Sequence, residues 1–238
     1  ILKEKIENDP KINELDIAIL ACYLPLNSLN TINAKLINYN SENVYFNDLI
    51  DVQIKEPINE IEIKRNIKSI SEFKNKISKE VRKQYEKNPY PRWRYCNQLH
   101  EVNLENDLNY QIRPNKVNFE KKSEKINILL AGCGTGKHLI NIGKYTNSNV
   151  LAVDLSLSSI AYAKRKVTEF NYNNIQFLHA DILDLNKLEQ KFDIIESVGT
   201  LHHMEKPTEG LKSLLGVLKP NGLLKLGLYS ELARKEIV

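Results

Sequence analysis

The sequence predicts an α/β fold in which a parallel sheet is covered by helices on both faces. Short apolar runs alternate with stretches of helical periodicity, which is typical of βαβ units. The runs are almost continuously apolar, as expected for strands that are buried on both faces. The strands are expected at 125–131, 150–153, 175–178, 192–195 and 223–228, and helices at 137–145, 156–170 and 207–218.

Residues 1–70 contain no glycine and predict a small N-terminal helical region. Apolar residues recur at helical spacing, as in the stripe Ile12, Leu15, Ile19 and Cys22. Breaks between helices are expected at 27–28 and 38–41, where Asn and Ser gather. Pro57 is expected in the first turn of a further helix.

A longer helix is predicted at 71–87, with Ser71 as its N-cap. Its apolar stripe consists of Phe73, Ile77, Val81 and Tyr85. The helix must end at the segment Asn-Pro-Tyr-Pro-Arg-Trp (88–93), because two nearby prolines hold the chain extended. We therefore expect a connecting segment at 71–124 and the α/β domain at 125–238.

Composition limits the classes of protein to consider. The chain has 238 residues and a net charge of +4, but its basic residues are spread along the sequence, so no nucleic-acid partner is expected. Three cysteines without a CxxC pair indicate neither a disulfide framework nor a zinc site. The longest apolar stretch, 15–26, is too short to span a bilayer. A cytoplasmic location is the expectation.

The first strand ends in Gly132-Cys133-Gly134-Thr135-Gly136. Ligands bind beyond the carboxyl ends of parallel strands, and glycines allow a sharp turn and a close approach. A dinucleotide fingerprint would need glycine at Lys137, and a triphosphate-binding loop would need a hydroxyl residue at His138. The remaining GxGxG pattern predicts a ligand loop, with a purely structural turn as the alternative.

Acidic residues follow the next two strands. A carboxylate at Asp154 can accept hydrogen bonds from two neighbouring ribose hydroxyls. The alternative is a helix N-cap, because Asp154 and Ser156 precede a helix. Asp181 can accept from an adenine amine and the N–H of Ile182 can donate to a ring nitrogen, with a simple turn as the alternative.

The fourth strand runs into Glu196 and Ser197, and His202 and His203 follow shortly after. Two histidines at the end of a sheet raise the question of a metal. Zinc needs three or four ligands, and no third soft ligand is near in the sequence. No metal is therefore expected; one histidine is predicted to be structural and the other to line the substrate side.

Together these segments resemble class I S-adenosylmethionine (SAM) dependent methyltransferases over about residues 80–230. The resemblance rests on 128–136, 152–156, the Asp181 segment, Leu-His-His at 201–203 and Leu-Lys-Pro-Asn-Gly at 218–222. More narrowly, 20–25, 84–93 and 227–234 resemble a bacterial group in which this module often follows tetratricopeptide repeats.

The resemblance implies a Rossmann-like sheet and SAM as the cofactor. Glycines 132, 134 and 136, with Cys133 and Thr135, would hold the methionine part of SAM. Asp154 would bind the ribose and Leu155 would flank the adenine. Asp181 and Ile182 would contact the adenine, and Glu196 and Ser197 would lie along the cofactor on the substrate side.

The family sheet has seven strands, and five are predicted here, so the resemblance also implies that the domain at 125–238 is truncated at its C-terminus. The segment 85–93 would fold over the site as a lid, with Tyr90 and Trp93 as contacts. The alternative, given equal weight, is that these aromatic side chains dock the helix onto the sheet.

Methyl transfer from a sulfonium depends mainly on aligning the nucleophile with the methyl group. A base is needed only for a protonated acceptor, and the candidates are Tyr90, Glu196, His202 and His203. The acceptor, a small molecule or a protein, is not identified. The alternatives are a SAM-fold interaction module without catalysis and an NAD-dependent oxidoreductase, against which Lys137 argues.

Overall fold

The computed structural model describes residues 1–73, 75–97, 100–117, 119 and 125–230. The chain divides into two compact units after Arg65, whereas the sequence placed the division after residue 70. Residues 68–71 join the second unit because they extend its sheet edge. The His179 N–H donates to the Lys68 carbonyl at 2.9 Å, and the Ile70 N–H donates to the His179 carbonyl at 3.2 Å.

The first unit is helical, as the sequence predicts. Its helices are α1 (Leu2–Asn8), α2 (Glu14–Ala21), α3 (Asn30–Leu36), α4 (Val44–Ile50) and α5 (Glu56–Arg65), with a short 3₁₀ turn at Leu26–Ser28. Their shared core includes Ile17, Leu20, Ile32, Leu36 and Ile50. No described helix is long and apolar enough to cross a membrane.

The apolar stripe expected at 12–22 is wrong. In α2 the buried residues are Ile17 and Leu20, whereas Leu15 is 69% exposed and Ile19 is 43% exposed. The helix is apolar on more than one side, so its spacing fits two stripes and the sequence alone could not choose between them.

Pro57 lies in the first turn of α5, as predicted, but no break in the helix precedes it. α4 continues through a π-helical turn, Asp51–Lys55, directly into α5, which begins at Glu56. Proline lacks an N–H and clashes with the carbonyl four residues earlier in a regular helix. A wider turn just before it relieves both problems, as π-turns do at irregular points of helices.

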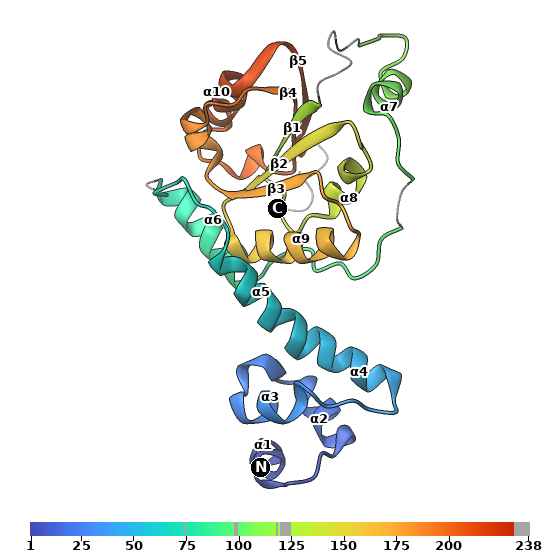
Figure 1. Ribbon diagram of the computed structural model, residues 1–238. Coiled ribbons are helices and arrows are strands. Elements are labelled where there is room, and N and C mark those ends of the chain that lie inside the picture. Colours follow the sequence, from blue (N-terminus) through green and yellow to red (C-terminus); the bar gives the residue numbers. More distant parts are fainter. Residues whose placement is uncertain (74, 98–99, 118, 120–124, 231–238) are drawn as a thin grey trace. The chain divides into compact units, whose positions relative to one another are not determined.

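The second unit contains a parallel sheet with the strand order β3-β2-β1-β4-β5 among the described residues (Figure 1). The strands are β1 (Ile126–Ala131), β2 (Ser148–Asp154), β3 (Ile175–His179), β4 (Phe192–Val198) and β5 (Leu218–Gly227). The chain adds β2 and β3 on one side of β1 and then crosses to the other side to form β4 and β5. The strand order therefore reverses between β3 and β4. The predicted α/β class is confirmed.

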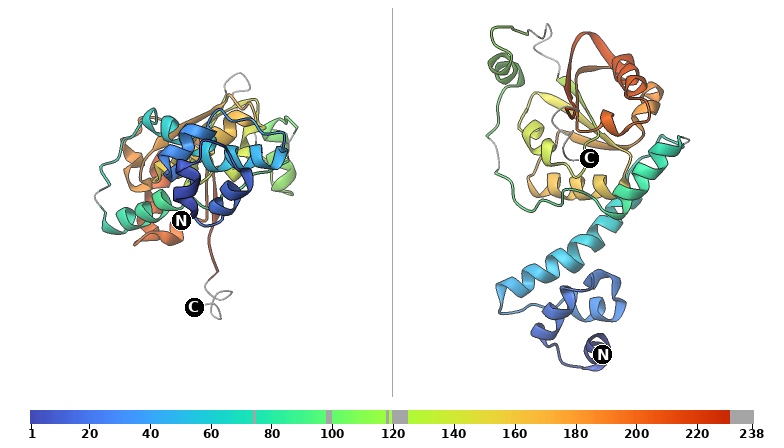
Figure 2. Two further views of the ribbon diagram at one scale, coloured as in Figure 1. Left: turned by 90° about the horizontal axis from the view of Figure 1, so that it is seen from below. Right: turned by 180° about the vertical axis from the view of Figure 1, so that it is seen from behind.

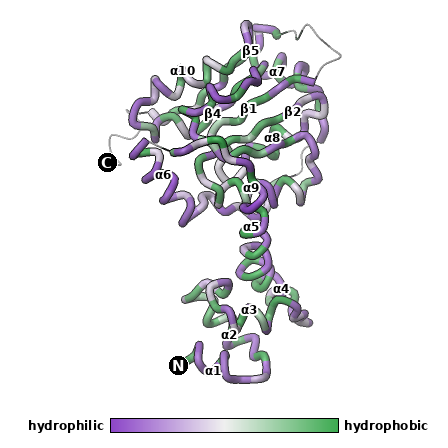
Figure 3. The backbone as a smooth tube through the Cα atoms, turned by 60° about the vertical axis from the view of Figure 1, so that its left-hand side comes forward, coloured by the Kyte–Doolittle hydropathy of each residue, from purple (hydrophilic) through white to green (hydrophobic). Residues whose placement is uncertain are grey.

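Helices cover both faces of this sheet (Figures 1 and 2). One face packs against α7 (Leu104–Gln111), α8 (Lys137–Gly143) and α9 (Leu157–Glu169). The other packs against α10 (Pro207–Val217) and the 3₁₀ segments at 182–187 and 201–203. The apolar strands therefore lie between two layers of helices. The hydropathy colouring of Figure 3 marks hydrophobic residues along β1 and β2.

The helix predicted at 71–87 is shorter than expected, because α6 spans Lys76–Lys87 and its N-cap is Asn75. Ser71 lies outside the helix, where its hydroxyl accepts a hydrogen bond from the Asp181 N–H at 2.9 Å. Phe73 has a positive φ of 50° and packs on His179, so the chain turns away from helical geometry before α6 begins.

β5 begins earlier than the predicted 223–228 and ends at Gly227. The Lys-Pro-Asn-Gly sequence that precedes residue 223 reads as a turn between helix and strand. In the structure it is an irregularity within the strand, with a register shift between Phe192 and Ile194. α7 is not predicted at all, although Asn103 caps it and acidic residues occupy its first turn.

Candidate functional site

A cavity of about 350 Å³ opens at the carboxyl ends of the strands. Its lining includes most of the residues that the sequence singled out: the loop 132–136, Asp154, Leu155, Asp181, Ile182, Tyr90 and His203. Glu196, Ser197, Trp93 and His202 are not among the lining residues. The chain reversal between β3 and β4 places this cavity where open α/β sheets bind ligands.

The glycine loop is held in a backbone conformation that other residues rarely adopt. Gly132, Gly134 and Gly136 have φ values of 82°, 52° and 81°. A Cβ on Gly136 would lie 2.7 Å from the Cβ of Ala163, so α9 can approach this loop only because residue 136 is glycine. A Cβ on Gly134 would meet nothing within 4 Å, so its backbone borders open space.

Asp154 ties the end of β2 to this loop. One carboxylate oxygen accepts from the Gly134 N–H at 2.8 Å, and the other accepts from the Ser156 N–H at 2.9 Å. Burial raises the pKa of Asp154, although these backbone hydrogen bonds act in the opposite direction. The N-cap of α9 is Ser156 and not Asp154. A carboxylate can accept about four hydrogen bonds, so capacity remains for a ligand.

Asp181 lies at the cavity and also takes part in a turn. It is buried and lines the cavity. One of its oxygens also accepts from the Leu183 N–H at 3.0 Å and so caps the 3₁₀ segment 182–187. Because the cap uses one oxygen, the other is available to a ligand that offers a donor.

α6 forms one wall of the cavity with Ile77, Val81 and Tyr85. Glu86, on the same helix, fixes that wall to the start of α9: its side chain accepts from the Ser158 N–H at 3.2 Å and the Ser158 hydroxyl at 2.6 Å, and also from the Leu157 N–H. Sequence reasoning missed Glu86. A carboxylate suits a helix N-terminus, but the sequence does not reveal which distant carboxylate lies there.

The residues of the segment 88–93 lie in two different environments. Tyr90 and Pro91 line the cavity, and Tyr90 is largely exposed. Trp93 is 6% exposed and packs with Tyr162 and Ile140, so it docks the segment onto the domain.

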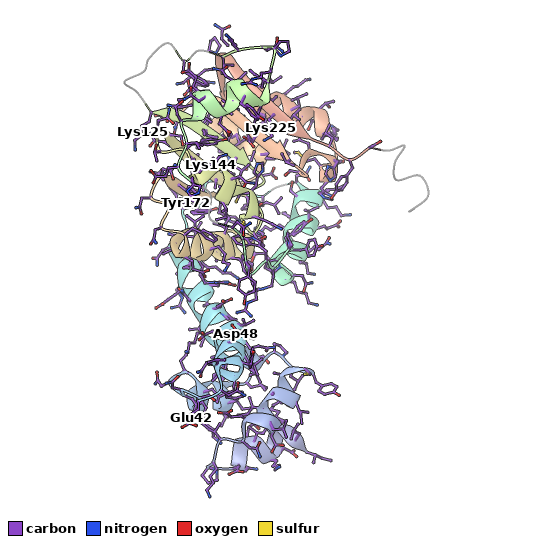
Figure 4. The ribbon with its side chains drawn as sticks, turned by 90° about the vertical axis from the view of Figure 1, so that its right-hand side faces the viewer. Glu42, Asp48, Lys125, Lys144, Tyr172 and Lys225 are labelled. Atoms are coloured by element: carbon purple, nitrogen blue, oxygen red, sulfur yellow. The ribbon has the colours of Figure 1, made fainter. Side chains whose placement is uncertain are left out.

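A charged cluster lies beside the glycine loop and was also missed. His138 Nε2 lies 3.0 Å from Glu196 Oε2, and Lys225 Nζ lies 3.2 Å from the same oxygen. Burial alone would raise the pKa of Glu196, but His138 and Lys225 outweigh it and lower the pKa below its usual value. His138 lines the cavity. Glu196 does not line it, but its carboxylate contacts His138. Lys225, on β5, is labelled in Figure 4.

His202 and His203 lie with Tyr229 at the edge of the cavity. The ring of His202 packs on Tyr229 at a centroid distance of 3.8 Å, and the two histidine Nε2 atoms are 3.1 Å apart. His203 and Tyr229 line the cavity. Within the described ranges, no group of three or more His, Cys, Asp or Glu side chains converges in a way that could hold a metal ion.

Part of the chain is similar in sequence to known proteins. Residues 128–222 match the family model described as a methyltransferase domain. An uncharacterised protein of a Synechococcus strain is 36% identical over 46% of this chain and 27% of its own length. The malonyl-[acyl-carrier protein] O-methyltransferase of Halalkalibacterium halodurans is 33% identical over 44% of this chain and 40% of its own length.

Among solved structures, PKMT2 from Rickettsia typhi in complex with AdoHcy is 33% identical, with a TM-score of 0.40, over 42% of this chain and 20% of that chain. The chain thus spans less than half the length of these relatives. The matched region of this chain contains the glycine loop, Asp154 and Asp181. Residues 128–222, less than half of this chain, are therefore similar to a methyltransferase domain.

Proposed function

We propose that this protein transfers a methyl group from SAM to an acceptor. The observation that carries the proposal is one cavity in which the glycine loop, Asp154 and Asp181 meet at the carboxyl ends of β1, β2 and β3. The match of 128–222 to the methyltransferase domain supports it.

The residues of the cavity fit this cofactor. The backbone at Gly134 borders open space, which lets a ligand approach the loop closely. Ser159 lines the cavity, and its hydroxyl oxygen is buried and has no hydrogen-bond partner among the described residues. Buried polar groups are normally hydrogen-bonded, so this hydroxyl favours a ligand with a polar group beside it.

The carboxylates are suited to the donor groups of an adenosine. Asp154 would accept from the ribose hydroxyls, and Asp181 would accept from the adenine amine. Leu155 and Ile182 would contact the adenine ring, and the apolar wall of α6 would exclude water from it. The glycine loop would hold the amino-acid part.

When bound, SAM supplies an electrophilic methyl group on a sulfonium. The residues then have to align the acceptor and, for a protonated acceptor, to remove a proton. Two of the four base candidates, Tyr90 and His203, line the cavity beside the apolar wall. We further propose that the acceptor is a small molecule or a protein and that the protein is cytoplasmic. We also propose that it belongs to the bacterial group of methyltransferases in which this module often follows tetratricopeptide repeats.

Calorimetry with S-adenosylhomocysteine, the reaction product, tests the proposal. We expect the wild type to bind it and Asp154→Asn to bind it about 10- to 150-fold more weakly, because charged hydrogen bonds to the ligand are lost. Asp193→Asn is the matched control. Asp193 likewise accepts a backbone N–H, that of Asn127 at 2.9 Å, but it lies at the opposite ends of the strands.

Two results would contradict the proposal. Tighter binding of NADH than of S-adenosylhomocysteine would favour an oxidoreductase. Failure of the folded wild-type chain to bind either ligand would favour an interaction module without cofactor. Equal weakening by Asp154→Asn and Asp193→Asn would show a loss of stability and not a lost ligand contact.

A further inference from the structure

The two ends of the cavity differ in charge: acidic side chains line one end and basic side chains line the other. Asp154 and Asp181 line it at the ends of β2 and β3, whereas Lys137 and His138 line it beside β1 and β4. An adenosine offers hydroxyl and amine donors, which suit the acidic end. The amino-acid part of the same cofactor carries a carboxylate, which suits the basic end.

His138 is the more strongly positioned of the two basic side chains. Its Nε2 atom lies 3.0 Å from Glu196 Oε2, and its side chain is 27% exposed, whereas Lys137 is exposed. The contact is an ion pair at this distance and not a hydrogen bond, because Glu196 Oε2 has no hydrogen-bond partner among the described residues. This contact places the imidazole beside Glu196, and the same side chain lines the cavity.

The surrounding charges favour a bound anion. The pKa of Glu196 is lowered, because His138 and Lys225 outweigh the effect of its burial, so Glu196 stays ionised at neutral pH. Lys225 Nζ, 3.2 Å from the same Glu196 oxygen, offsets the negative charge of Glu196. With His138 protonated, the cluster carries one net positive charge, which complements a carboxylate.

We propose that His138, positioned by Glu196, binds the carboxylate of the amino-acid part of the cofactor. This inference rests on the proposed function and assigns a ligand contact to a residue that the glycine pattern does not include. Glu196 acts through His138 as a positioning residue. The pair would make the site select the complete cofactor over an adenosine thioether that lacks the carboxylate.

The test compares two ligands by calorimetry: S-adenosylhomocysteine and its decarboxylated analogue, which keeps the amine and the thioether. We expect His138→Asn to weaken S-adenosylhomocysteine about 10- to 150-fold, as loss of a charged hydrogen bond does, and to leave the analogue unchanged. Glu196→Gln should weaken S-adenosylhomocysteine selectively in the same way, by a smaller factor, because the imidazole remains but loses its counter-charge.

A purely structural role of His138 would weaken both ligands equally, which would overturn the inference. Equal wild-type affinity for both ligands would also overturn it, because no carboxylate would be recognised. Lys137→Gln is the comparison variant. If Lys137→Gln removes the preference for S-adenosylhomocysteine over its decarboxylated analogue and His138→Asn does not, the carboxylate contact is Lys137 and not His138. If the folded wild type binds neither ligand, the proposed function itself fails. Glu196→Gln keeps the test decisive should His138→Asn not fold.

Discussion

The indole N–H of Trp93 donates a hydrogen bond to the backbone carbonyl of Thr135 at 3.0 Å. The hydroxyl of Thr135 donates in return to the Pro91 carbonyl at 2.6 Å. These two hydrogen bonds hold the segment 91–93 against Thr135 of the glycine loop. The only tryptophan of the chain therefore stabilises the ligand loop without lining the cavity.

Replacing this indole should lower the free energy of unfolding in two steps. Trp93→Phe removes the hydrogen bond but keeps a ring, and should cost about 1–2 kcal/mol. Trp93→Ala also removes the packing against Tyr162 and should cost about 3–5 kcal/mol. Urea unfolding measures both values. If Trp93→Phe is as stable as the wild type, the hydrogen bond to Thr135 does not stabilise the loop.

Two loop glycines should respond differently to alanine. Both substitutions force a side chain into a left-handed conformation, at about 1–2 kcal/mol each. Gly136→Ala adds a clash with Ala163 and should unfold at a clearly lower temperature than Gly134→Ala. Gly134→Ala should keep most of the stability but lose affinity for S-adenosylhomocysteine, because its methyl group occupies open space beside the cavity. Thermal unfolding and calorimetry measure the pair, and equal melting temperatures would contradict the close packing at Gly136.

The strands and the helices of the sheet were predictable because their patterns are local. Apolar runs bounded by glycine or acidic residues mark each strand, and β1 to β4 lie where they were expected. The failures are places where distant contacts decide. Ser71 caps no helix because it receives the Asp181 N–H, and the exposed face of α2 was misassigned because either of its apolar stripes fits a helix.

The site was predictable in part for the same reason. Gly132, Asp154 and Asp181 follow strands directly, so chain order alone places them at one edge of the sheet. His138 and Glu86 were missed because their partners, Glu196 and Ser158, come from other elements of the chain. The family resemblance placed Glu196 along the cofactor, and its side chain faces His138 and Lys225.

Glu86 should stabilise the start of α9 and, through it, the wall of the cavity. Glu86→Ala removes the acceptor for the Leu157 and Ser158 groups and should cost about 1–3 kcal/mol in the free energy of unfolding. The control is Glu80→Ala, an exposed carboxylate on the same helix, which should change stability little. Equal effects of the two variants in urea unfolding would rule out the capping role.

His179 should make the stability of the second unit depend on pH. Burial, aided by the charge of Arg82, lowers the pKa of His179 below its usual value of 6.5, although the carbonyl of Leu155 acts in the opposite direction. The unfolded chain therefore binds a proton at higher pH than the folded chain does. Stability is complete above about pH 6.5 and is lost as the pH falls through that value toward the folded-state pKa. The loss amounts to about 1.4 kcal/mol for each pH unit that separates the pKa of the folded chain from that of the unfolded chain.

Urea unfolding of the wild type and of His179→Gln between pH 5 and pH 8 measures this dependence. The variant should be less stable at pH 8, because it loses the ring contacts to Phe73 and the hydrogen bonds to Ser69 and Leu155. It should also lose less stability on acidification, so the difference between the two proteins should shrink as the pH falls. The other histidines are present in both proteins, so their titration cancels in that difference. A difference that stays constant with pH would show that protonation of His179 is not coupled to folding.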